Sequence, residues 1–195
     1  MRYFQQLIFF VFLISPSIDF ANAETFKAPK CLAGLCLDAK LPLENNIRSH
    51  FGGHKKREFK NDFSYCYKFI EKNKKISYGY FLFKSAVNKG LVTIKLSRTK
   101  ICEGATVKVS GDTLVTEKGL RLGSSKDDTL KLYGTPNNEL RPAAEDLLSD
   151  FFGKNSINKA DKIFQYLDNA NASYPNTRFY YLNNEIVGIE LSIDE

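Results

Sequence analysis

Residues 91–97 have the sequence Leu-Val-Thr-Ile-Lys-Leu-Ser, and residues 186–192 have the closely similar sequence Ile-Val-Gly-Ile-Glu-Leu-Ser. Polar residues that alternate with apolar and β-branched ones are typical of a β-strand. An aromatic run precedes each segment, Tyr-Phe-Leu-Phe at 80–83 and Phe-Tyr-Tyr-Leu at 179–182. Because the same two elements recur in the same order, we expect the chain to contain two copies of one unit.

Two further landmarks open each copy. Gly34-Leu35-Cys36-Leu37 matches Gly119-Leu120-Arg121-Leu122. Each is followed by a helical pattern that ends in an aromatic residue and a glycine, first at Phe51-Gly52 and then at Tyr133-Gly134. Glycine is common just after a helix because it adopts a positive φ without strain. We therefore expect an export signal at 1–23, a first repeat at 24–112 and a second repeat at 113–195.

In the first repeat, Pro42 is suited to the first turn of a helix that runs to about Phe51. Strands are expected at 63–70, 76–83 and 91–97, and a small connecting hairpin at 106–109 and 114–116.

In the second repeat, Ser124 or Ser125 can cap a helix that ends at Tyr133. Further elements are expected as a helix at 143–152 and strands at 162–167, 178–182 and 185–193. The sequence therefore predicts an α+β fold of two tandem repeats, each with one or two short helices packed on an antiparallel β-meander.

The second repeat carries a recognisable motif. Gly119-x3-Gly123-Ser124, then Leu130-x2-Tyr133-Gly134-x-Pro136, then a strand with Ile186-Val187-Gly188-Ile189, resembles the helix-then-meander repeat of the β-lactamase-inhibitor-like fold. Outer-membrane assembly lipoproteins of the SmpA/OmlA type share this repeat. The motif consists of glycines and apolar positions, without a catalytic residue. The resemblance implies a periplasmic or secreted binding module, although no cysteine stands at the cleavage point to carry a lipid.

The N-terminal segment has the features of an export signal. Arg2 is followed by the apolar run 7–14, and Ala21-Asn22-Ala23 forms a cleavage site before Glu24. No apolar run reaches the roughly 18 residues of a membrane-spanning helix. We expect cleavage between Ala23 and Glu24, and a mature protein that is periplasmic or secreted and does not span a membrane.

The cysteine content is consistent with export. All four cysteines lie in the mature chain, and in an oxidising compartment an even number favours two disulfides with three possible pairings. The spacing Cys31-x4-Cys36-x13-His50-x3-His54 approaches that of a zinc site. Because a glycine pair separates the histidines and oxidation removes the thiolate ligands, we expect no metal and no cofactor. The disulfide candidates are Cys31, Cys36, Cys66 and Cys102.

Charge divides the mature chain unevenly. Residues 24–112 hold 18 Lys and Arg against 8 Asp and Glu, a net charge of +10. Residues 113–195 hold 9 against 13, a net charge of −4. A basic half in an exported protein favours an acidic protein or an anionic envelope polymer as the partner, and makes nucleic acid an unsuitable one. A solvated lysine-rich surface without a partner is the simpler interpretation of the same numbers.

No catalytic motif is present. The chain has no G-x-S-x-G elbow, no phosphate-binding glycine loop and no H-E-x-x-H, and we expect a protein that is not an enzyme. Aromatic residues in two neighbouring strands instead predict a binding surface, because tyrosine gives a large contact area at a low entropy cost. Packing of the two repeats against each other explains the same rings equally well. The candidate binding residues are Tyr65, Tyr67, Tyr78, Tyr80, Lys68 and Lys84.

Two functions follow from these observations. The first is a protein-binding or inhibitor-like module in which the tyrosines share one exposed sheet face. The second is an electrostatic binder of anionic envelope polymer that uses the basic half. High salt should abolish the second kind of binding and spare the first.

Overall fold

The structure is a computed structural model that describes residues 28–37, 47, 49, 51–52, 57–59, 62–84, 90–110, 112–141, 145–153, 159–168 and 175–193. Several predictions lie outside these residues. They concern the signal segment, the cleavage site at Ala23 and Glu24, the two histidines, and the starts of the helices at Pro42 and Pro142.

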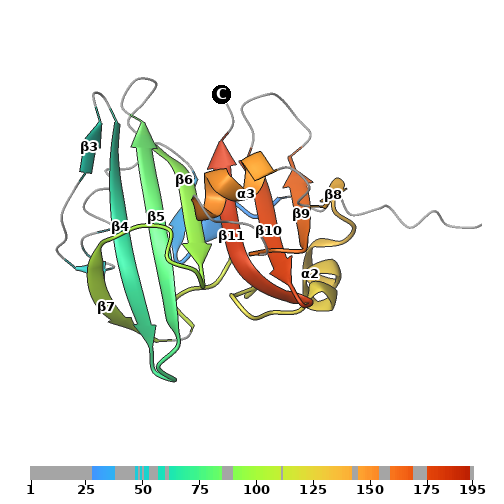
Figure 1. Cartoon of the computed structure of the whole chain (residues 1–195), viewed down its shortest axis with the longest axis horizontal. Helices are drawn as coiled ribbons and strands as arrows, with labels where there is room; N and C mark the ends of the chain where they lie inside the picture. The colour runs from blue at the N-terminus through green and yellow to red at the C-terminus, as the bar shows by residue number, and fades with distance from the viewer. Residues whose placement is uncertain are drawn as a thin grey trace, which may run out of the picture.

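One large sheet organises the described chain (Figure 1). Its strands follow the order β3-β4-β5-β6-β11-β10-β9-β8, and β7 pairs with β4 beside β3. The pairs are antiparallel except β4 and β7, which are parallel. A separate two-stranded hairpin joins β1 and β2. The bounds are β1 (Cys31–Leu32), β2 (Leu35–Cys36), β3 (Arg57–Phe59), β4 (Asp62–Glu71), β5 (Ile76–Lys84), β6 (Gly90–Ser97), β7 (Ala105–Val109), β8 (Asn138–Leu140), β9 (Lys162–Leu167), β10 (Pro175–Leu182) and β11 (Glu185–Ile193).

The expected α+β class is wrong. The described residues form a mostly β protein with a nine-stranded sheet, and they include only two complete helices, α2 (Lys126–Tyr133) and α3 (Glu145–Phe152). The last long strand of each expected repeat, β6 in the first and β11 in the second, has one edge without a partner in its own meander. The two strands also share an apolar pattern. These edges pair with each other, because an unpaired strand edge leaves backbone hydrogen-bonding groups unsatisfied. Two separate meanders thus become one sheet.

The pairing of β6 with β11 has a symmetric register. Ile94 lies opposite Leu191, and Leu96 lies opposite Ile189. Lys95 lies opposite Glu190, and these two residues occupy corresponding positions of the two similar segments. If residues 91–97 and 186–192 exchanged places, corresponding positions would still face each other.

A β-bulge recurs on both sides of this centre. In β5 and β6 the register shifts between Leu82 and Phe83, and in β10 and β11 it shifts between Tyr180 and Tyr181. The skipped residues are Val92 and Val187, which are separated by the same offset as the two similar segments. The two halves of the sheet thus share a local irregularity as well as their strand order.

The main core covers one face of the sheet. The aromatic residue before each predicted glycine cap packs on it: the Phe51 ring lies 5.3 Å from that of Tyr67, and the Tyr133 ring lies 6.0 Å from that of Tyr166. The Tyr133 hydroxyl donates to Thr116 Oγ1 at 2.9 Å, and burial raises the pKa of Tyr133 to about 12. The largest buried side chains on this face are Tyr65, Tyr67, Phe69, Phe81, Phe83, Tyr133, Phe164, Tyr166, Phe179 and Tyr181.

Helix α2 begins as its sequence predicts. Ser125 is the N-cap and accepts a hydrogen bond from the Asp128 N–H, while Asp128 Oδ2 accepts one from the Ser125 N–H at 3.0 Å. This reciprocal capping box satisfies backbone donors that the first helical turn leaves open. The helix ends at Gly134, which has a φ of 72°.

Helix α3 covers the opposite face of the sheet, which we call the outer face, over β10 and β11. The Phe151 ring stacks on Tyr180 with centroids 4.1 Å apart. A Cβ on Gly188 would lie 2.5 Å from the Phe151 ring, so only glycine fits beneath the helix. The corresponding residue of the first half is Thr93, which carries no such helix among the described residues.

A charged cluster occupies the centre of the outer face. Glu190 Oε1 lies 3.2 Å from Lys95 Nζ, and Glu190 Oε2 lies 3.5 Å from an Arg178 nitrogen. The Tyr180 hydroxyl donates to Glu190 Oε2 at 2.7 Å, and burial, reinforced by the Glu190 charge, raises the pKa of Tyr180. Lys95 Nζ also donates to the Asp150 carbonyl at the end of α3 at 2.9 Å. These contacts join both halves of the sheet to the helix.

The expected hairpin of 106–109 with 114–116 is wrong. β7 pairs in parallel with β4, for example Val107 with Phe69, so its apolar side chains extend the main core. Val115 and Thr116 form isolated bridges to Arg121 and Leu32 instead.

Candidate functional site

The candidate tyrosines lie on two different faces of the sheet. Residues directly opposite each other in an antiparallel pair share a face. Tyr65 lies opposite Phe81, and Tyr67 lies opposite Gly79. Both Tyr65 and Tyr67 are completely buried in the main core. The expectation that all four tyrosines share one exposed face is therefore wrong: the register places the odd-numbered residues of β4 opposite the odd-numbered residues of β5.

The other candidates lie on the outer face. Lys68 lies opposite Tyr78, and Tyr80 lies opposite Cys66. Lys68, Tyr78 and Tyr80 are each half-buried. Lys84 ends β5 opposite Asp62, and its side chain lies outside the described residues. The structure thus brings Lys68 and Tyr78 together and separates them from Tyr65 and Tyr67.

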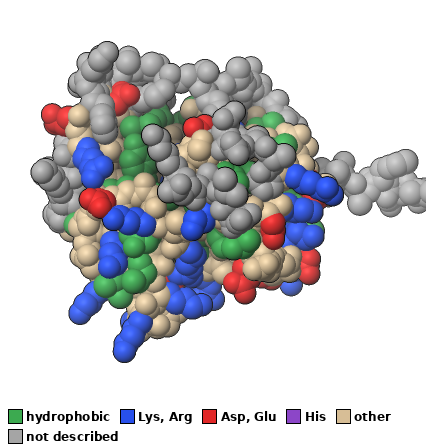
Figure 2. Space-filling model, viewed as in Figure 1, with side chains coloured by type: hydrophobic (Ala, Val, Ile, Leu, Met, Phe, Trp, Pro, Cys, Tyr) green, Lys and Arg blue, Asp and Glu red, His purple; other side chains and the backbone are tan. Residues whose placement is uncertain are grey.

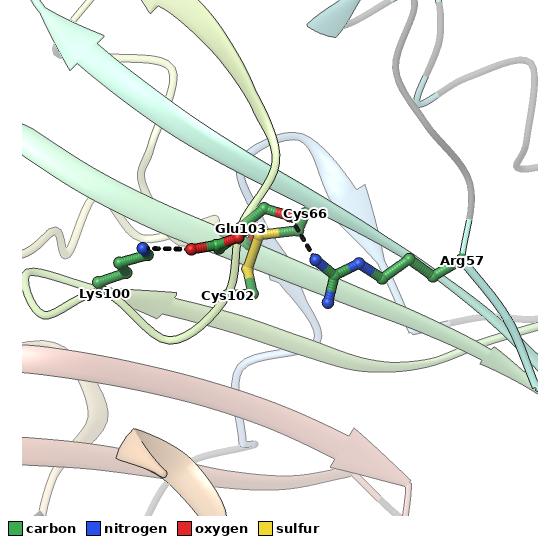
Figure 3. The surroundings of a disulfide bond; sticks show 6 residues. Arg57, Cys66, Lys100, Cys102 and Glu103 are labelled. Carbon is green, nitrogen blue, oxygen red and sulfur yellow. Dashed lines mark hydrogen bonds and ion pairs between the residues drawn. A yellow bond between two sulfur atoms is a disulfide. The ribbon is translucent and has the colours of Figure 1, made fainter. Parts of the chain in front are cut away.

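A segment that follows β6 crosses this face. Residues 98–104, the crossing segment, connect the end of β6 to the start of β7. The disulfide between Cys66 and Cys102 fastens the segment to β4 (Figure 3). Gly104 lies so close to the backbone of Cys66 that no Cβ would fit there. Cys102 Sγ lies 3.5 Å from the Gly79 carbonyl oxygen, so the segment crosses β5 between Tyr78 and Tyr80.

Polar contacts of Glu103, next to the disulfide, support the crossing segment from β3 and from within the segment itself. Arg57 donates to the Glu103 carbonyl at 3.1 Å, and Lys100 Nζ lies 2.6 Å from Glu103 Oε1 (Figure 3). The hydrogen bond and charge of this exposed pair raise the pKa of Lys100 and lower the pKa of Glu103. The crossing segment is therefore fixed relative to the sheet and forms one border of the surface around Tyr78.

Five lysines surround the end of β4 and β5 beyond the crossing segment. We call this surface, together with Ile76 and Tyr78, the basic end. In the part of the chain that the structure describes, none of the five lysines has an acidic ion-pair partner. Two neighbouring carboxylates pair with other residues, since Glu71 binds Arg98 at 2.7 Å and Glu103 binds Lys100. The five lysines are Lys68, Lys72, Lys74, Lys75 and Lys108.

The turn between β4 and β5 orients three of these lysines. Lys74 has a φ of 62° and donates its backbone N–H to the Glu71 carbonyl at 2.8 Å. Asn73 Oδ1 accepts the backbone N–H of Lys75 at 3.0 Å. These bonds use the backbone N–H groups of Lys74 and Lys75 and no lysine side chain, and Lys72, Lys74 and Lys75 are all exposed. Figure 2 shows Lys and Arg side chains around hydrophobic ones over this end of β4 and β5.

Ile76 stands at the centre of the basic end. With 40% of its surface exposed, it stands out among the large hydrophobic residues that the structure describes. It borders a groove of about 310 Å³ that is lined by Lys75, Ile76, Arg98, Gly123, Glu185, Ile186 and Val187. Ile76 thus combines an apolar side chain, a groove and a basic rim, as the core and rim of a protein-binding site do.

A second hollow lies beside the Cys31–Cys36 disulfide. It has a volume of about 450 Å³, and its charged lining residues are Asp112 and Glu117. The Glu117 carboxylate accepts the backbone N–H groups of Lys30 and Cys31 at 3.2 and 3.1 Å. The carboxylate thus fixes the start of the described chain.

The described residues do not gather the side chains that a metal site needs. No group of three or more His, Cys, Asp or Glu side chains in them could hold a metal ion. The two disulfides, Cys31–Cys36 and Cys66–Cys102, use all four cysteines and remove the thiolates that the zinc spacing requires. Disulfides of this kind persist in an oxidising compartment.

Comparisons of this chain with protein-family models, with curated proteins and with solved structures find no match. Among the described helices, none is both long enough and apolar enough to cross a membrane.

Sequence reasoning missed most of the basic end. It selected Lys68 and Tyr78 for their strand positions but passed over the run Lys72-Asn73-Lys74-Lys75-Ile76. The available signal was a lysine-rich turn followed directly by an apolar strand residue. Lys108 could not be found in this way, because only the parallel pairing of β7 places it opposite Ile70.

Proposed function

We propose that this chain is an exported, non-enzymatic protein that binds an acidic partner protein through the basic end. The paired cysteines support an oxidising compartment, and the signal-like segment at 1–23 supports a periplasmic or secreted location. A binding role agrees with the resemblance to the β-lactamase-inhibitor-like repeat, which remains a prediction.

One observation carries the proposal. The exposed Ile76 and the half-buried Tyr78 lie among five lysines that have no acidic partner in the described part of the chain. Unpaired like charges repel one another, and an acidic partner relieves that repulsion while it covers the apolar side chains. Tyrosine supplies contact area at a low entropy cost, so Tyr78 is suited to the centre of such an interface.

The second candidate is an anionic envelope polymer. The lysines of the β4–β5 turn favour it, because three of them project at the tip of one hairpin and can follow a flexible anionic chain. A polymer of this kind needs the lysines but makes no use of Ile76 or Tyr78.

Capture from the envelope fraction of the producing cells tests the proposal. The mature protein, a Tyr78→Ala variant and a Lys131→Gln control on the exposed surface of α2 serve as baits. We expect Tyr78→Ala to weaken retention of one protein at least tenfold and Lys131→Gln to leave it unchanged, because an interface tyrosine commonly contributes about 2 kcal/mol. Retention of a polymer alone, lost in high salt and equal for all three baits, would favour the second candidate.

A further inference from the structure

The groove at the basic end arises from an early stop of one strand. β6 ends at Ser97, opposite Tyr78, so Ile76 and Ser77 at the start of β5 have no partner on β6. The chain then turns at Arg98, whose backbone N–H donates to the Val187 carbonyl at 3.0 Å. On the far side, the Gly123 N–H donates to the Ile186 carbonyl at 2.8 Å. The groove at the basic end therefore lies between β5 and β11, where the sheet lacks a strand, and we call it the notch.

The notch suits a side chain of a larger ligand. Its volume of about 310 Å³ is at the lower limit of the roughly 300–1,000 Å³ of small-molecule sites. Its apolar walls are Ile76, Ile186 and Val187, from two strands that do not pair with each other. An apolar side chain that entered between them would remove Ile76 from water.

The charges around the notch select the ligand. Arg98 is engaged by Glu71 at 2.7 Å and by the Leu122 carbonyl at 3.0 Å, so it contributes a fixed positive charge. Lys75 lines the notch, and Lys72 and Lys74 lie in the adjoining turn without acidic partners among the described residues. Glu185 is the one acidic residue of the lining. The surroundings of the notch are thus basic on the side of β5.

We propose that the occupant of this notch is an acidic, extended segment of the partner protein, with one apolar side chain inserted against Ile76. The inference rests on the proposed function and specifies its partner. The acidic residues on either side of the apolar one lie against Lys72, Lys74 and Lys75, and the apolar residue provides the specificity that charge alone lacks.

Two matched peptides test the proposal. The probes are fluorescein-labelled Asp-Glu-Asp-Leu-Asp-Glu-Asp and the same peptide with serine in place of leucine, titrated with the mature protein at low salt and followed by fluorescence anisotropy. We expect the leucine peptide to bind at least about tenfold more tightly, because the leucine side chain leaves water when it enters the notch. Ile76→Ser should remove this preference, and Lys72→Gln with Lys74→Gln should weaken both peptides alike.

Methyl NMR spectra give a second readout that does not depend on a variant. The leucine peptide should shift the methyl signals of Ile76, Ile186 and Val187 and leave those of Ile163, beneath α3, unchanged. Equal affinity of the two peptides, or shifts at Ile163 alone, would overturn the inference. Preferential binding of heparin that is insensitive to Ile76→Ser would overturn it in favour of a polymer. Capture of a protein that depends on Tyr78, together with equal affinity for both peptides, would leave the proposed function standing and reject only this occupant.

Discussion

Lys95 and Glu190 lie directly opposite each other at the centre of the sheet, with Lys95 Nζ 3.2 Å from Glu190 Oε1. They occupy corresponding positions in the two similar segments, 91–97 and 186–192. Because their charges are opposite, the two facing side chains attract each other and form an ion pair. Arg178 and the Tyr180 hydroxyl add two further contacts to the same carboxylate. The joint between the two halves thus depends on one acidic residue that is 6% exposed.

We expect Glu190→Ala to destabilise the protein by about 3 kcal/mol. The change leaves Lys95 and Arg178 with no counter-charge in a largely buried place, which is costly. The matched control is Glu139→Ala, which breaks an exposed pair with Lys162 and should cost less than about 1 kcal/mol. Urea denaturation of both variants measures the difference, and equal costs would show that the central pair contributes no more than a surface pair.

Tyr67→Ala should lower the free energy of unfolding by about 3–5 kcal/mol. The Tyr67 ring is completely buried and packs against Phe51 and Phe69, so its loss opens a cavity. Tyr80→Ala on the outer face should cost distinctly less, because that ring is half-buried. Thermal melts of the two variants measure this difference in stability. A larger loss of stability for Tyr80→Ala than for Tyr67→Ala would contradict the placement of Tyr67 in the main core and Tyr80 on the outer face.

Removal of the Cys66–Cys102 disulfide should cost more than removal of the Cys31–Cys36 disulfide. The first closes a loop with a sequence separation of 36 residues and the second a loop of 5. The chain-entropy relation gives about 4 kcal/mol for the longer loop and about 2 kcal/mol for the shorter one. Paired Cys→Ala variants measured in urea test this order. The reverse order would indicate that residual structure in the unfolded chain outweighs loop closure.

The capping box of α2 predicts a dependence of stability on pH. The hydrogen bonds that Asp128 accepts from Ser125 lower the pKa of its carboxyl group in the folded state. The unfolded state therefore binds a proton more readily, so this stabilisation is present above the unfolded pKa and is lost as the pH falls through the folded pKa. Above the unfolded pKa, the unmodified protein should have a higher free energy of unfolding than Asp128→Asn. This difference should shrink as the pH falls through the folded pKa of Asp128. An advantage that stays constant down to the lowest pH would contradict this mechanism.

The longer strands and the start of α2 could be predicted from sequence, whereas the expected hairpin of 106–109 with 114–116 was wrong. Period-two alternation located β4, β5, β6 and β11, and the pair Ser124 and Ser125 marked the start of α2, where Ser125 is the cap. The fold class could not be predicted in this way. Whether Ile94 packs against a helix or pairs through its strand with Leu191 depends on a partner nearly a hundred residues away, and periodicity carries no information about it.

The internal duplication remains a prediction, and one difference between the two similar segments has a structural reason. Thr93 and Gly188 differ between the two segments because α3 covers Gly188 and leaves no room for a Cβ. The candidate site was predicted only in part, because the face of each tyrosine depends on the register of β4 with β5, and a shift of one residue exchanges the faces.

The central claim is that the basic end binds a partner protein. Site-specific photo-crosslinking tests it most directly. A photoreactive amino acid replaces Ile76 in one version of the exported protein and the exposed Lys131 of α2 in another, and both are irradiated in the producing cells. We expect a crosslinked protein adduct from position 76 and none from position 131. An adduct from position 131 alone, or from neither position, would contradict it.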